Sequence, residues 1–591
     1  MLVLGINAAY HESAAAVVRD GEVLFAVEEE RLTRVKHGKV ARASNPDELP
    51  WRAIRACLDE LPVAGVEVDA IAYSLVPGLR LETLGPDPCP GDAPEGFGTE
   101  AGEREFDARV RGVPALIGRE RGGLGDPGNR IASAPVRFIP HHVAHAASAF
   151  YPSSFESAAV LVVDGIGERA TAWLGRGAGG RLEPVEEVLY PRSIGMLWER
   201  VAVWLGFTAY DAPKVMGLAA FGDAGPHLAA LDRLFAVTDP DGGRAGVDPP
   251  PFAIDPALAR FRAAGVAGLE SLFGPGRREG ESPEEARFAG VAAALQRRTE
   301  EAVLALARRL GRATGERRLA YAGGVALNCL ANARLEREGP FDEIYVPSAA
   351  HDAGTAIGAA LEAAPSAERR RAAGDRPPVP FLGPEHGGRE IEAALARAGL
   401  AAERVADPAA AAARLLAAGA LVGWFQGRLE LGPRALGHRS LLADPRRADV
   451  RDDLNRRIKH REPFRPFAAS FLAEAAADWL ELPAGRPGAA ASRDLMLVAY
   501  PVRPARRAAI PAVVHRDGTC RAQVIDRRRD PRFHALVSHL GELTGVPAVL
   551  NTSFNDREPI VGSPADAIET FRRAGLDALF LEDCLVRRPA T

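Results

Sequence analysis

The stretch LVLGINAAYHESAAAVVRDGEVLFAVEEERL, residues 2–32, decides the fold of the first part of the chain. Its apolar residues fall into three short runs, 2–6, 14–18 and 23–27, and an Asp-Gly pair separates the last two. Apolar runs of this length that end near Gly or Asp are typical of β-strands, and Asp-Gly favours a tight hairpin turn. The stretch therefore predicts a strand, a loop of small residues and a β-hairpin.

The same pattern occurs again in AAVLVVDGIGERATAWL, residues 158–174. We expect a strand, a Gly-containing turn and a second strand there. Two such units far apart in one chain indicate an internal repeat. A duplicated ATPase fold of the actin and sugar-kinase type requires this arrangement, because each of its lobes has one phosphate-binding hairpin.

The chain of 591 residues is too long for one hydrophobic core, so we expect at least two domains. The sequence APSAERRRAAGDRPPVP, residues 364–380, is charged, rich in Pro and without apolar periodicity, which is typical of a linker. We therefore expect one domain over residues 1–363 and another over residues 381–591. Residues 86–130 indicate an exposed, partly helical insertion, and residues 239–280 match no motif.

The net charge of −5 is divided unevenly, because the part after the expected linker has an excess of basic side chains and the rest an excess of acidic ones. A basic C-terminal part favours a local anionic ligand over a nucleic-acid surface. The five cysteines are single, with no CxxC pair, which is typical of a reducing compartment. The N-terminus lacks the pattern of a signal peptide, and no apolar run is long enough to span a bilayer. We expect a cytoplasmic monomer or homodimer that binds neither nucleic acid nor a membrane.

The segment HHVAHAASAF, residues 141–150, places His141 and His145 four residues apart. On a helix this spacing puts both imidazoles on one face, as a divalent metal site requires. His142 points elsewhere and is expected to be structural. An isolated pair with this spacing is also typical of ordinary surface or core histidines, so the pair alone leaves both interpretations open.

Two aspartates are candidates to complete a metal site. Asp164 ends an apolar strand before a Gly turn. Asp352 lies in VPSAAHDAGTAIGAAL, between a strand and the start of a helix of small residues. Taken singly, each position is equally typical of a turn or helix-capping residue.

Three further features suit nucleotide or acceptor chemistry. The segment YAGGVALN, residues 321–328, predicts a strand, a double glycine and a helix start, where backbone amides favour phosphate or ribose oxygens. His11, in the loop after the first strand, has the residue type to take a proton from an acceptor hydroxyl, and Lys36 the type to neutralise phosphate charge. A tight turn, a loop histidine without a role and a solvated basic turn would explain the same residues.

The densest basic segment runs from Arg434 to Arg465 and contains ten basic and five acidic residues. Both of these arginines neighbour a proline, which indicates that turns hold them. Guanidinium groups suit the planar, bidentate recognition of phosphate or carbamate, although a surface basic patch has the same composition. The segment LNTSFNDREP adds Asn551 and Ser553 at a strand end, where an amide and a hydroxyl can complete an oxyanion pocket.

Nine segments occur in one order across nearly the whole chain: GINAAYHESAA, HHVAHAASAFYPSSF, VVDGIGE, KVMGLAAFG, AGGVALN, HDAGTAIGAAL, GPRALGHRSLLADPR, KHREPFRPFA and LNTSFN. In this order they resemble the NodU/CmcH family of O-carbamoyltransferases. The number of segments makes this resemblance far more specific than any single motif. It implies an α/β chain with an N-terminal actin/sugar-kinase-like domain, made of duplicated ribonuclease-H-like lobes, and a C-terminal YrdC-like domain.

The resemblance also implies a reaction and its residues. The YrdC-like domain makes carbamoyl adenylate from carbamoyl phosphate and ATP with Mg²⁺, and the N-terminal domain transfers the carbamoyl group to a small-molecule hydroxyl. The ligands of iron or another divalent metal are then His141, His145, Asp164 and Asp352. The implied general base is His11, and the implied nucleotide contacts are Lys36, Gly324 and Asn328. The implied contacts to carbamoyl phosphate and its adenylate are Arg434, Lys459, Arg465, Arg521, Asn551 and Ser553.

Other enzyme classes share parts of this domain set, namely tRNA threonylcarbamoyl enzymes and hydrogenase-maturation enzymes. An RNA-modifying enzyme requires a basic RNA-facing surface, whereas the N-terminal part of this chain is acidic. A hydrogenase-maturation enzyme would contain zinc-finger segments, and no CxxC pair occurs. A regulatory module without turnover predicts loss of His11 or of the paired histidines, and all are present. No motif identifies the acceptor.

Overall fold

The computed structural model describes residues 1–61, 67–84, 91–92, 95–119, 130–131, 133–369, 379–483 and 492–588. These residues form two compact units. The first unit contains residues 1–29 and 37–369, and the second contains residues 30–36, 379–483 and 492–588. About half of the expected linker and parts of the expected insertion lie outside the described residues, so both features and the domain boundaries stay predictions.

The first sheet of the first unit has five strands in the order β3-β2-β1-β4-β5. They are β1 (Leu2–Asn7), β2 (Ala14–Arg19), β3 (Glu22–Glu28), β4 (Ala70–Tyr73) and β5 (Val136–Phe138). The strands β1, β2 and β3 pair antiparallel, whereas β4 runs parallel to β1 and β5 parallel to β4. The strand and the hairpin expected over residues 2–27 are therefore confirmed. Every residue of β1 is buried, which explains its almost continuous apolar run.

The second sheet repeats the first, with the order β12-β11-β6-β7-β8. Its strands are β6 (Ser157–Val163), β7 (Ala170–Ala178), β8 (Arg181–Leu189), β11 (Arg318–Ala322) and β12 (Glu343–Tyr345). Here β6, β7 and β8 pair antiparallel, and β11 and β12 run parallel to β6. The expected internal repeat is thus present in both strand order and strand direction.

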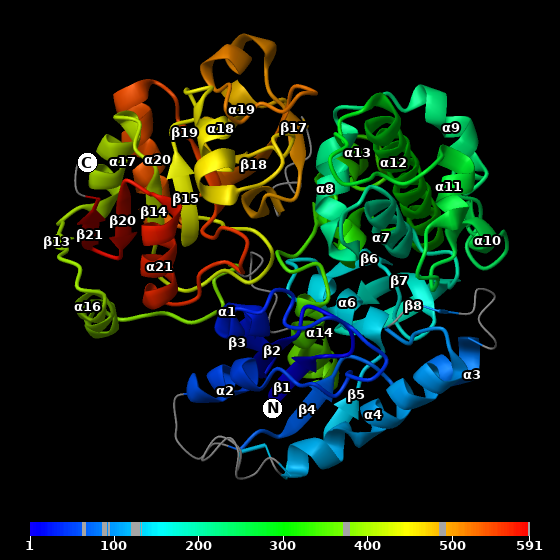
Figure 1. Ribbon diagram of the computed structural model, residues 1–591. Helices are drawn as coiled ribbons and strands as arrows, with labels where there is room; N and C mark the ends of the chain where they lie inside the picture. The colour runs from blue at the N-terminus through cyan, green and yellow to red at the C-terminus, as the bar shows by residue number, and fades with distance from the viewer. Residues whose placement is uncertain are drawn as a thin grey trace. The chain divides into compact units, whose positions relative to one another are not determined.

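One helix follows the last strand of each sheet: α6 (His141–Phe150) follows β5, and α14 (Ala353–Ala363) follows β12. In Figure 1, α14 lies beside α6 and the strands of the first sheet. The two helices touch through their backbones, because a Cβ on Gly358 of α14 would lie 1.8 Å from the carbonyl oxygen of Ala144 of α6. A Cβ on Gly5 of β1 would lie 1.9 Å from a carbonyl oxygen of α14. Small residues therefore let α14 pack closely against both β1 and α6.

Further helices and two short strands complete the first unit. The longest is α12 (Ala286–Thr314), an amphipathic helix. The others are α2 (Trp51–Asp59), α3 (Leu79–Leu84), α4 (Glu100–Arg119), α7 (Ile194–Trp204), η1 (Ala209–Asp211), α8 (Ala212–Ala219), α9 (Gly225–Asp232), β9 (Phe235–Val237), β10 (Phe252–Ile254), α10 (Pro256–Ala259), α11 (Ala267–Phe273), η2 (Gly324–Leu327), α13 (Cys329–Glu338) and α15 (Ser366–Arg369). A short helix, α1 (Glu29–Thr33), begins in the first unit and ends in the second.

The second unit is built on a nine-stranded sheet with the order β13-β21-β20-β14-β15-β19-β16-β18-β17. Its strands are β13 (Glu403–Arg404), β14 (Val422–Phe425), β15 (Arg439–Ala443), β16 (Ala468–Leu472), β17 (Ala499–Pro501), β18 (Thr519–Ile525), β19 (Ala548–Ser553), β20 (Ala578–Leu581) and β21 (Cys584–Arg587). Its helices are α16 (Gly388–Arg397), α17 (Pro408–Ala417), α18 (Val450–Asp453), η4 (Leu454–Lys459), α19 (Ala476–Trp479), η6 (Pro504–Ala509), α20 (Pro531–Thr544) and α21 (Pro564–Ala574).

The core of the second unit positions its polar face. The helices α17 and α20 pack together and cover Trp424, Leu442 and Val549, which come from three neighbouring strands. Side chains two residues apart on a strand share a face. Asn551 is two residues beyond Val549 on β19, so its polar side chain lies on the same face of the sheet as the apolar core. The apolar core thus passes directly into the region that contains the predicted anion contacts.

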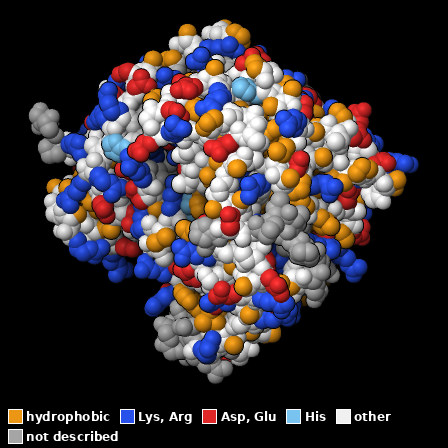
Figure 2. All heavy atoms as spheres, turned by 45° about the vertical axis from the view of Figure 1, so that its right-hand side comes forward, with side chains coloured by type: hydrophobic (Ala, Val, Ile, Leu, Met, Phe, Trp, Pro, Cys, Tyr) orange, Lys and Arg blue, Asp and Glu red, His pale blue; other side chains and the backbone are white. Residues whose placement is uncertain are grey.

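No helix in the described part of the chain is long and apolar enough to cross a membrane. Basic and acidic side chains are interspersed over the face of the molecule shown in Figure 2.

Candidate functional site

The two histidines of the metal candidate lie one turn apart on α6, and both are fully buried. Glu168 holds the start of this helix, because its carboxylate accepts hydrogen bonds from the backbone N–H groups of His141 (3.0 Å) and Val76 (2.9 Å). An acidic side chain at a helix N-terminus is favourable. Nδ1 of His141 lies 3.2 Å from the carbonyl oxygen of Ser74. When this nitrogen donates, Nε2 keeps its lone pair and faces the site.

Asp164 follows β6 directly and reaches the same space. Its Oδ1 accepts a hydrogen bond of 2.7 Å from the backbone N–H of Gly324. Its Oδ2 lies 3.5 Å from Nε2 of His141 and 3.6 Å from Nε2 of His145. One carboxylate oxygen is therefore fixed by the chain, and the other faces both histidines.

Asp352 occupies the N-cap position of α14, but its side chain makes no capping hydrogen bond. Its Oδ1 lies 3.6 Å from Nε2 of His141 and 3.4 Å from Nε2 of His145. An aspartate in this position ordinarily caps its own helix. Here the carboxylate faces the two histidines instead.

These four side chains fit a divalent metal. One ligand atom from each lies within 4.8 Å of the other three. The Nε2 atoms of both histidines are buried without a hydrogen-bond partner, which is uncommon for interior polar atoms. Metal–ligand distances of about 2.0–2.2 Å for imidazole and carboxylate are compatible with this spacing. Two imidazoles and two carboxylates suit iron, zinc and related divalent metals.

The charges within the cluster also favour a cation. Burial opposes ionisation of Asp164, but the two histidines outweigh burial and hold the pKa of this carboxyl well below its usual range. Burial lowers the pKa of His141, but Asp352 and Asp164 outweigh it and raise that pKa well above its usual value. A bound divalent cation would take the place of these protons and leave the imidazoles neutral.

His142 is buried beside the pair and does not belong to the set of four. Burial and the neighbouring His141 lower the pKa of His142 to about 3, so its ring is neutral. A Cβ on Gly167 would lie 2.5 Å from Nδ1 of His142. The ring therefore packs against the turn after β6, and its structural role stays a prediction.

His11 lies in the loop after β1, where the side-chain amide of Asn7 donates to the carbonyl oxygens of His11 (3.1 Å) and Glu12 (3.0 Å). The His11 ring meets Tyr210 edge-on, with 5.4 Å between the centroids, and its Nδ1 is buried without a hydrogen-bond partner. Burial lowers the pKa of His11, but Asp352 and Glu12 outweigh burial and raise it. His11 is therefore close enough to the cluster to respond to the charge of one of its carboxylates.

A strained pair supports this loop. Glu12 and His37 have positive φ angles of 53° and 63°, which are uncommon for residues other than glycine. The backbone N–H of Glu12 donates to the carbonyl oxygen of His37 (2.9 Å), and the two side chains share a hydrogen bond of 2.6 Å. The His37 ring stacks on Tyr210, with 4.8 Å between the centroids. These contacts keep the strained backbone in place and fix the surroundings of His11.

One charged residue beside the cluster was not anticipated from the sequence. Glu199 lies on α7 one turn after Gly195, on which a Cβ would lie 2.6 Å from the backbone nitrogen of Gly165. The Oε1 of Glu199 lies 3.8 Å from the place of a Cβ on Gly165, the residue that follows Asp164. Burial raises the pKa of Glu199 to about 7. The sequence signal is the charged pair Glu199 and Arg200 inside the otherwise apolar stretch MLWERVAVW.

The nucleotide contacts implied for the first unit are engaged in other bonds. The backbone N–H of Gly324 donates to Asp164. Oδ1 of Asn328 accepts from the backbone N–H of Ala331 (3.1 Å), and its side chain exchanges two hydrogen bonds with Gln296. A role of Gly324 and Asn328 in nucleotide binding stays a prediction.

Residues 30–36 belong to the second unit, although they follow β3 in the chain. Arg34 donates hydrogen bonds to the carbonyl oxygens of Ile560 (2.6 Å) and Pro559 (2.8 Å). Lys36 ends this segment and is exposed, and its contact with nucleotide stays a prediction. This short segment therefore belongs to the second unit, although the residues before and after it belong to the first.

Three neighbouring strands of the second unit place two predicted residues in one row. Ala468 of β16 pairs with Asn551 of β19, and the register of β18 places Arg521 on the other side of Ala468. Neighbouring strands are about 4.8 Å apart and residues in one row share a face, so the short Ala468 leaves space between the amide and the guanidinium. Nε of Arg521 and Oδ1 of Asn551 are both buried without a hydrogen-bond partner. A ligand with acceptor oxygens and an N–H donor fits this row.

Lys459 is buried at the end of η4 and contacts the end of β19. Its Nζ donates to the carbonyl oxygens of Ser553 (2.5 Å) and Asn555 (2.8 Å) and to Oδ1 of Asn555 (2.7 Å). Burial and the nearby Arg461 and Arg465 hold the pKa of Lys459 well below its usual range. Lys459 therefore organises the loop after β19, and its direct contact with substrate stays a prediction.

Arg461 is a further cation of this face that the sequence did not single out. Its guanidinium lies over the ring of Phe467 at 4.4 Å, and its Nε donates to Oδ1 of Asn455 at 2.8 Å. Its Nη2 is buried without a hydrogen-bond partner. Burial and the charges of Arg465 and Arg521 hold the pKa of Arg461 well below its usual range. Arginines that oppose one another's ionisation favour a bound anion.

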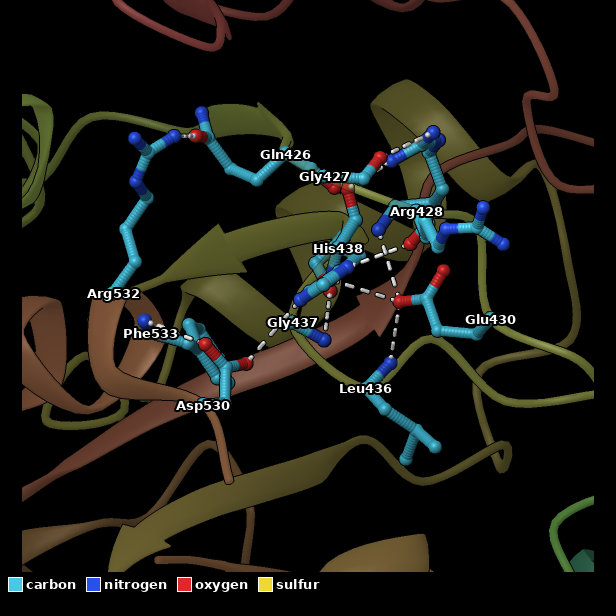
Figure 3. A network of polar contacts seen from close by, with 12 residues as sticks. Gln426, Gly427, Arg428, Glu430, Leu436, Gly437, His438, Asp530, Arg532 and Phe533 are labelled. Carbon is cyan, nitrogen blue, oxygen red and sulfur yellow. Dashed lines mark hydrogen bonds and ion pairs between the residues drawn. The ribbon is translucent and has the colours of Figure 1, made fainter. Parts of the chain in front are cut away.

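The loop that contains Arg434 is held by one buried carboxylate, as Figure 3 shows. Oε1 of Glu430 accepts hydrogen bonds from the backbone N–H groups of Leu436 (2.8 Å), His438 (2.9 Å) and Arg439 (2.9 Å). Three donors on one carboxylate oxygen define the path of the chain between β14 and β15.

One side chain connects this loop to the row on the sheet. Nε2 of Gln523 donates to the carbonyl oxygen of Leu436 at 2.6 Å. Oε1 of the same Gln523 accepts a hydrogen bond of 3.1 Å from Nδ2 of Asn551. The structure therefore brings the loop of Arg434 close to Asn551, although more than 100 residues separate them in the sequence.

Replacing Glu430 with alanine should destabilise the second unit by roughly 3 kcal/mol or more, because three buried backbone N–H groups lose their acceptor. Thermal unfolding followed by circular dichroism measures the effect. Glu430→Gln keeps an oxygen acceptor and should cost less than half as much. An alanine variant that unfolds at the wild-type temperature would show that this carboxylate does not hold the loop.

Two models of one enzyme family match most of the chain. A family model described as "Carbamoyltransferase N-terminus" matches residues 2–361, and one described as "Carbamoyltransferase C-terminus" matches residues 413–588. The chain therefore belongs to the carbamoyltransferase family and is a transferase.

Two curated relatives show how far the similarity extends. Nodulation protein NolNO of Sinorhizobium fredii is 37% identical over 593 residues, which cover 98% of this chain and 80% of that protein. Nodulation protein NolO of Bradyrhizobium diazoefficiens is 38% identical over 76% of this chain and 79% of its own length. The solved structure of HypF from T. kodakarensis aligns with 60% of this chain and 46% of that chain, at 15% identity and a TM-score of 0.30, which is too low to carry an argument.

Proposed function

We propose that the protein is an ATP-dependent O-carbamoyltransferase that works in two steps. The second unit makes carbamoyl adenylate from carbamoyl phosphate and ATP, and the first unit transfers the carbamoyl group to a hydroxyl of a small-molecule natural product. The observation that carries the proposal is the buried set of two histidines and two aspartates near His11 in a carbamoyltransferase. We assign the first unit to the actin/sugar-kinase-like class, which its repeated sheet supports, and the second to the YrdC-like class.

The first step takes place on the arginine-rich face of the second unit. Carbamoyl phosphate loses its phosphate to water and leaves carbamate. A carbamate oxygen then bonds to the α-phosphorus of ATP, and pyrophosphate leaves with the electron pair of the broken P–O bond. Oδ1 of Asn551 suits the N–H of the carbamoyl group, and Arg521 and Arg461 suit its oxygens and the phosphates. Mg²⁺ accompanies ATP as its counter-ion.

The second step takes place in the first unit. The acceptor oxygen bonds to the carbamoyl carbon, the bond between that carbon and the phosphate oxygen breaks, and AMP leaves. His11 takes the acceptor proton, for which its unpartnered Nδ1 is suited. His141, His145, Asp164 and Asp352 would hold a divalent metal, iron or a related ion, and this metal would supply Lewis-acid stabilisation of negative charge. The burial of this cluster limits hydrolysis by water.

Incubation of the full chain with ATP, Mg²⁺ and carbamoyl phosphate tests the first step. We expect pyrophosphate release that depends on carbamoyl phosphate and an adenylate detectable by mass spectrometry. Absence of both products would contradict the proposal.

Replacing His11 with asparagine should leave adenylate formation unchanged and lower transfer by about 10²–10⁴-fold, the usual contribution of a general base. Asparagine can form hydrogen bonds but cannot take a proton. The measurement compares pyrophosphate release with the appearance of carbamoylated products from a panel of sugars and other alcohols. Equal loss of both activities would show that His11 has a structural role.

A further inference from the structure

Arg262 lies within residues 239–280, which match no sequence motif. Its guanidinium lies over the rings of Phe97 at 5.2 Å and Tyr190 at 5.7 Å. Its Nε is buried without a hydrogen-bond partner, and Arg262 forms no ion pair within the described residues. Two aromatic rings thus hold a cation whose charge no side-chain carboxylate neutralises directly.

A neighbouring arginine provides the contrast. The guanidinium of Arg80 also lies over the ring of Phe97, at 5.5 Å from its centroid. Unlike Arg262, Arg80 forms a buried ion pair with Glu103. Burial and the charge of Arg80 lower the pKa of Arg262. A ligand oxygen that approached Arg262 would therefore meet a poorly compensated cation, whereas Arg80 already has its partner.

Glu199 is the matching unpaired acid. It is half-buried beside Gly165 and forms no hydrogen bond or ion pair in the described part of the chain. The next residue, Arg200, donates through Nη1 to the carbonyl oxygen of Ala263 at 2.8 Å. Arg200 thus ties the helix of Glu199 to the loop of Arg262. The charges of Arg262 and His11 both act on Glu199.

Ring contacts connect Arg262 to the metal candidate. The ring of Phe97, under the guanidinium, lies 6.1 Å from the ring of Tyr10, which in turn lies 5.6 Å from the ring of His141. The unpaired acid therefore lies beside the turn after Asp164, and the unpaired cation is connected to His141 through the rings of Phe97 and Tyr10.

We propose that Glu199 and Arg262 form the acceptor subsite of the transferase and bind an oxygen function adjacent to the hydroxyl that is carbamoylated. The inference rests on the proposed function. A hydroxyl can donate to the carboxylate and accept from the guanidinium, so the pair suits a neutral acceptor with two neighbouring hydroxyls. Arg262 opposes a polycationic acceptor and Glu199 a polyanionic one. Both residues determine specificity, and neither takes part in bond making.

The test compares two acceptors, trans-cyclohexane-1,2-diol and cyclohexanol, with the full chain, ATP, Mg²⁺ and carbamoyl phosphate. The wild-type chain should carbamoylate the diol with a kcat/KM roughly tenfold or more above that of cyclohexanol. The reason is that the second hydroxyl forms hydrogen bonds with Glu199 and Arg262, which otherwise have no such partner among the residues that the structure describes. Glu199→Gln and Arg262→Gln should reduce this ratio to about one, mainly through a higher KM for the diol. Arg262→Lys keeps the charge without the planar fork and should restore only part of the preference.

Matched controls are Glu284→Gln and Arg278→Gln, two exposed residues of the same unit, which should keep the wild-type ratio. Pyrophosphate release and metal content show that each variant is folded. An unchanged ratio in the Glu199 and Arg262 variants, or adenylate formation without transfer to either alcohol, would overturn the acceptor subsite and leave the adenylate step standing. Absence of pyrophosphate release in the wild-type chain would instead overturn the proposed function.

Discussion

Replacing His145 with alanine should remove the bound divalent metal and lower carbamoyl transfer by about 10³-fold, while adenylate formation continues. His145 supplies one of the four ligand atoms that lie within 4.8 Å of one another. Its loss leaves Asp164 and Asp352 with one imidazole fewer between them. A Lewis acid contributes several kcal/mol to charge stabilisation, and each 1.4 kcal/mol corresponds to about a factor of ten in rate.

Metal content after anaerobic loading with Fe²⁺ measures the first effect, and the ratio of carbamoylated product to pyrophosphate measures the second. The control is His142→Ala, which removes a buried imidazole of the same helix that lies outside the set of four. This control should keep one metal per chain even if it lowers stability. A His145 variant that binds the metal as tightly as the wild type would exclude the cluster as the metal site.

The candidate metal ligands could be named from the sequence because the family resemblance joins local patterns that, taken singly, leave the role of each residue open. Two histidines four apart on a helix share a face, and Asp164 ends a strand before a Gly turn. The sequence could not supply the distance to Asp352, whose position is equally typical of a helix cap. That distance depends on the close crossing of α14 and α6 at Gly358, a contact between segments more than 200 residues apart.

Glu199 and Arg262 could not be predicted, because no local pattern distinguishes them. Glu199 is one acid in an apolar helix, and Arg262 follows a short helix in a segment without a motif. Their importance comes from what surrounds them in space. Gly195 lets α7 approach the turn after Asp164, and the ring of Phe97 reaches Arg262 from a distant part of the chain.

In the second unit, the sequence predicted the kind of site better than the contacts of each side chain. The basic segment indicated an anion site, and the register of three strands places Arg521 and Asn551 on either side of Ala468. The family resemblance implies that Lys459 contacts substrate, which stays a prediction, and in the structure its amino group donates to the loop after β19. A sequence shows that a lysine is present, but only the fold shows which acceptors surround it.

Replacing Arg521 with glutamine should raise the KM for carbamoyl phosphate in the pyrophosphate-release assay by roughly 100-fold, because a charged, desolvated hydrogen bond to the ligand is lost. Glutamine keeps most of the length of the side chain and removes the charge. The buried Nε of Arg521 has no partner in the protein, so its removal leaves no protein acceptor unsatisfied and should cost little stability. The matched control is Arg527→Gln, an exposed residue just after the same strand, which should behave as the wild type.

The Arg521 and His145 variants together test whether the two steps use separate sites. The Arg521 variant should bind metal normally and transfer the carbamoyl group at the wild-type rate when carbamoyl adenylate is supplied to it. The His145 variant should form the adenylate and fail to transfer it. Opposite losses in the two assays require two sites with different chemistry, because a single site would lose both activities in either variant. Loss of transfer from supplied adenylate in the Arg521 variant would place this arginine in the second step as well.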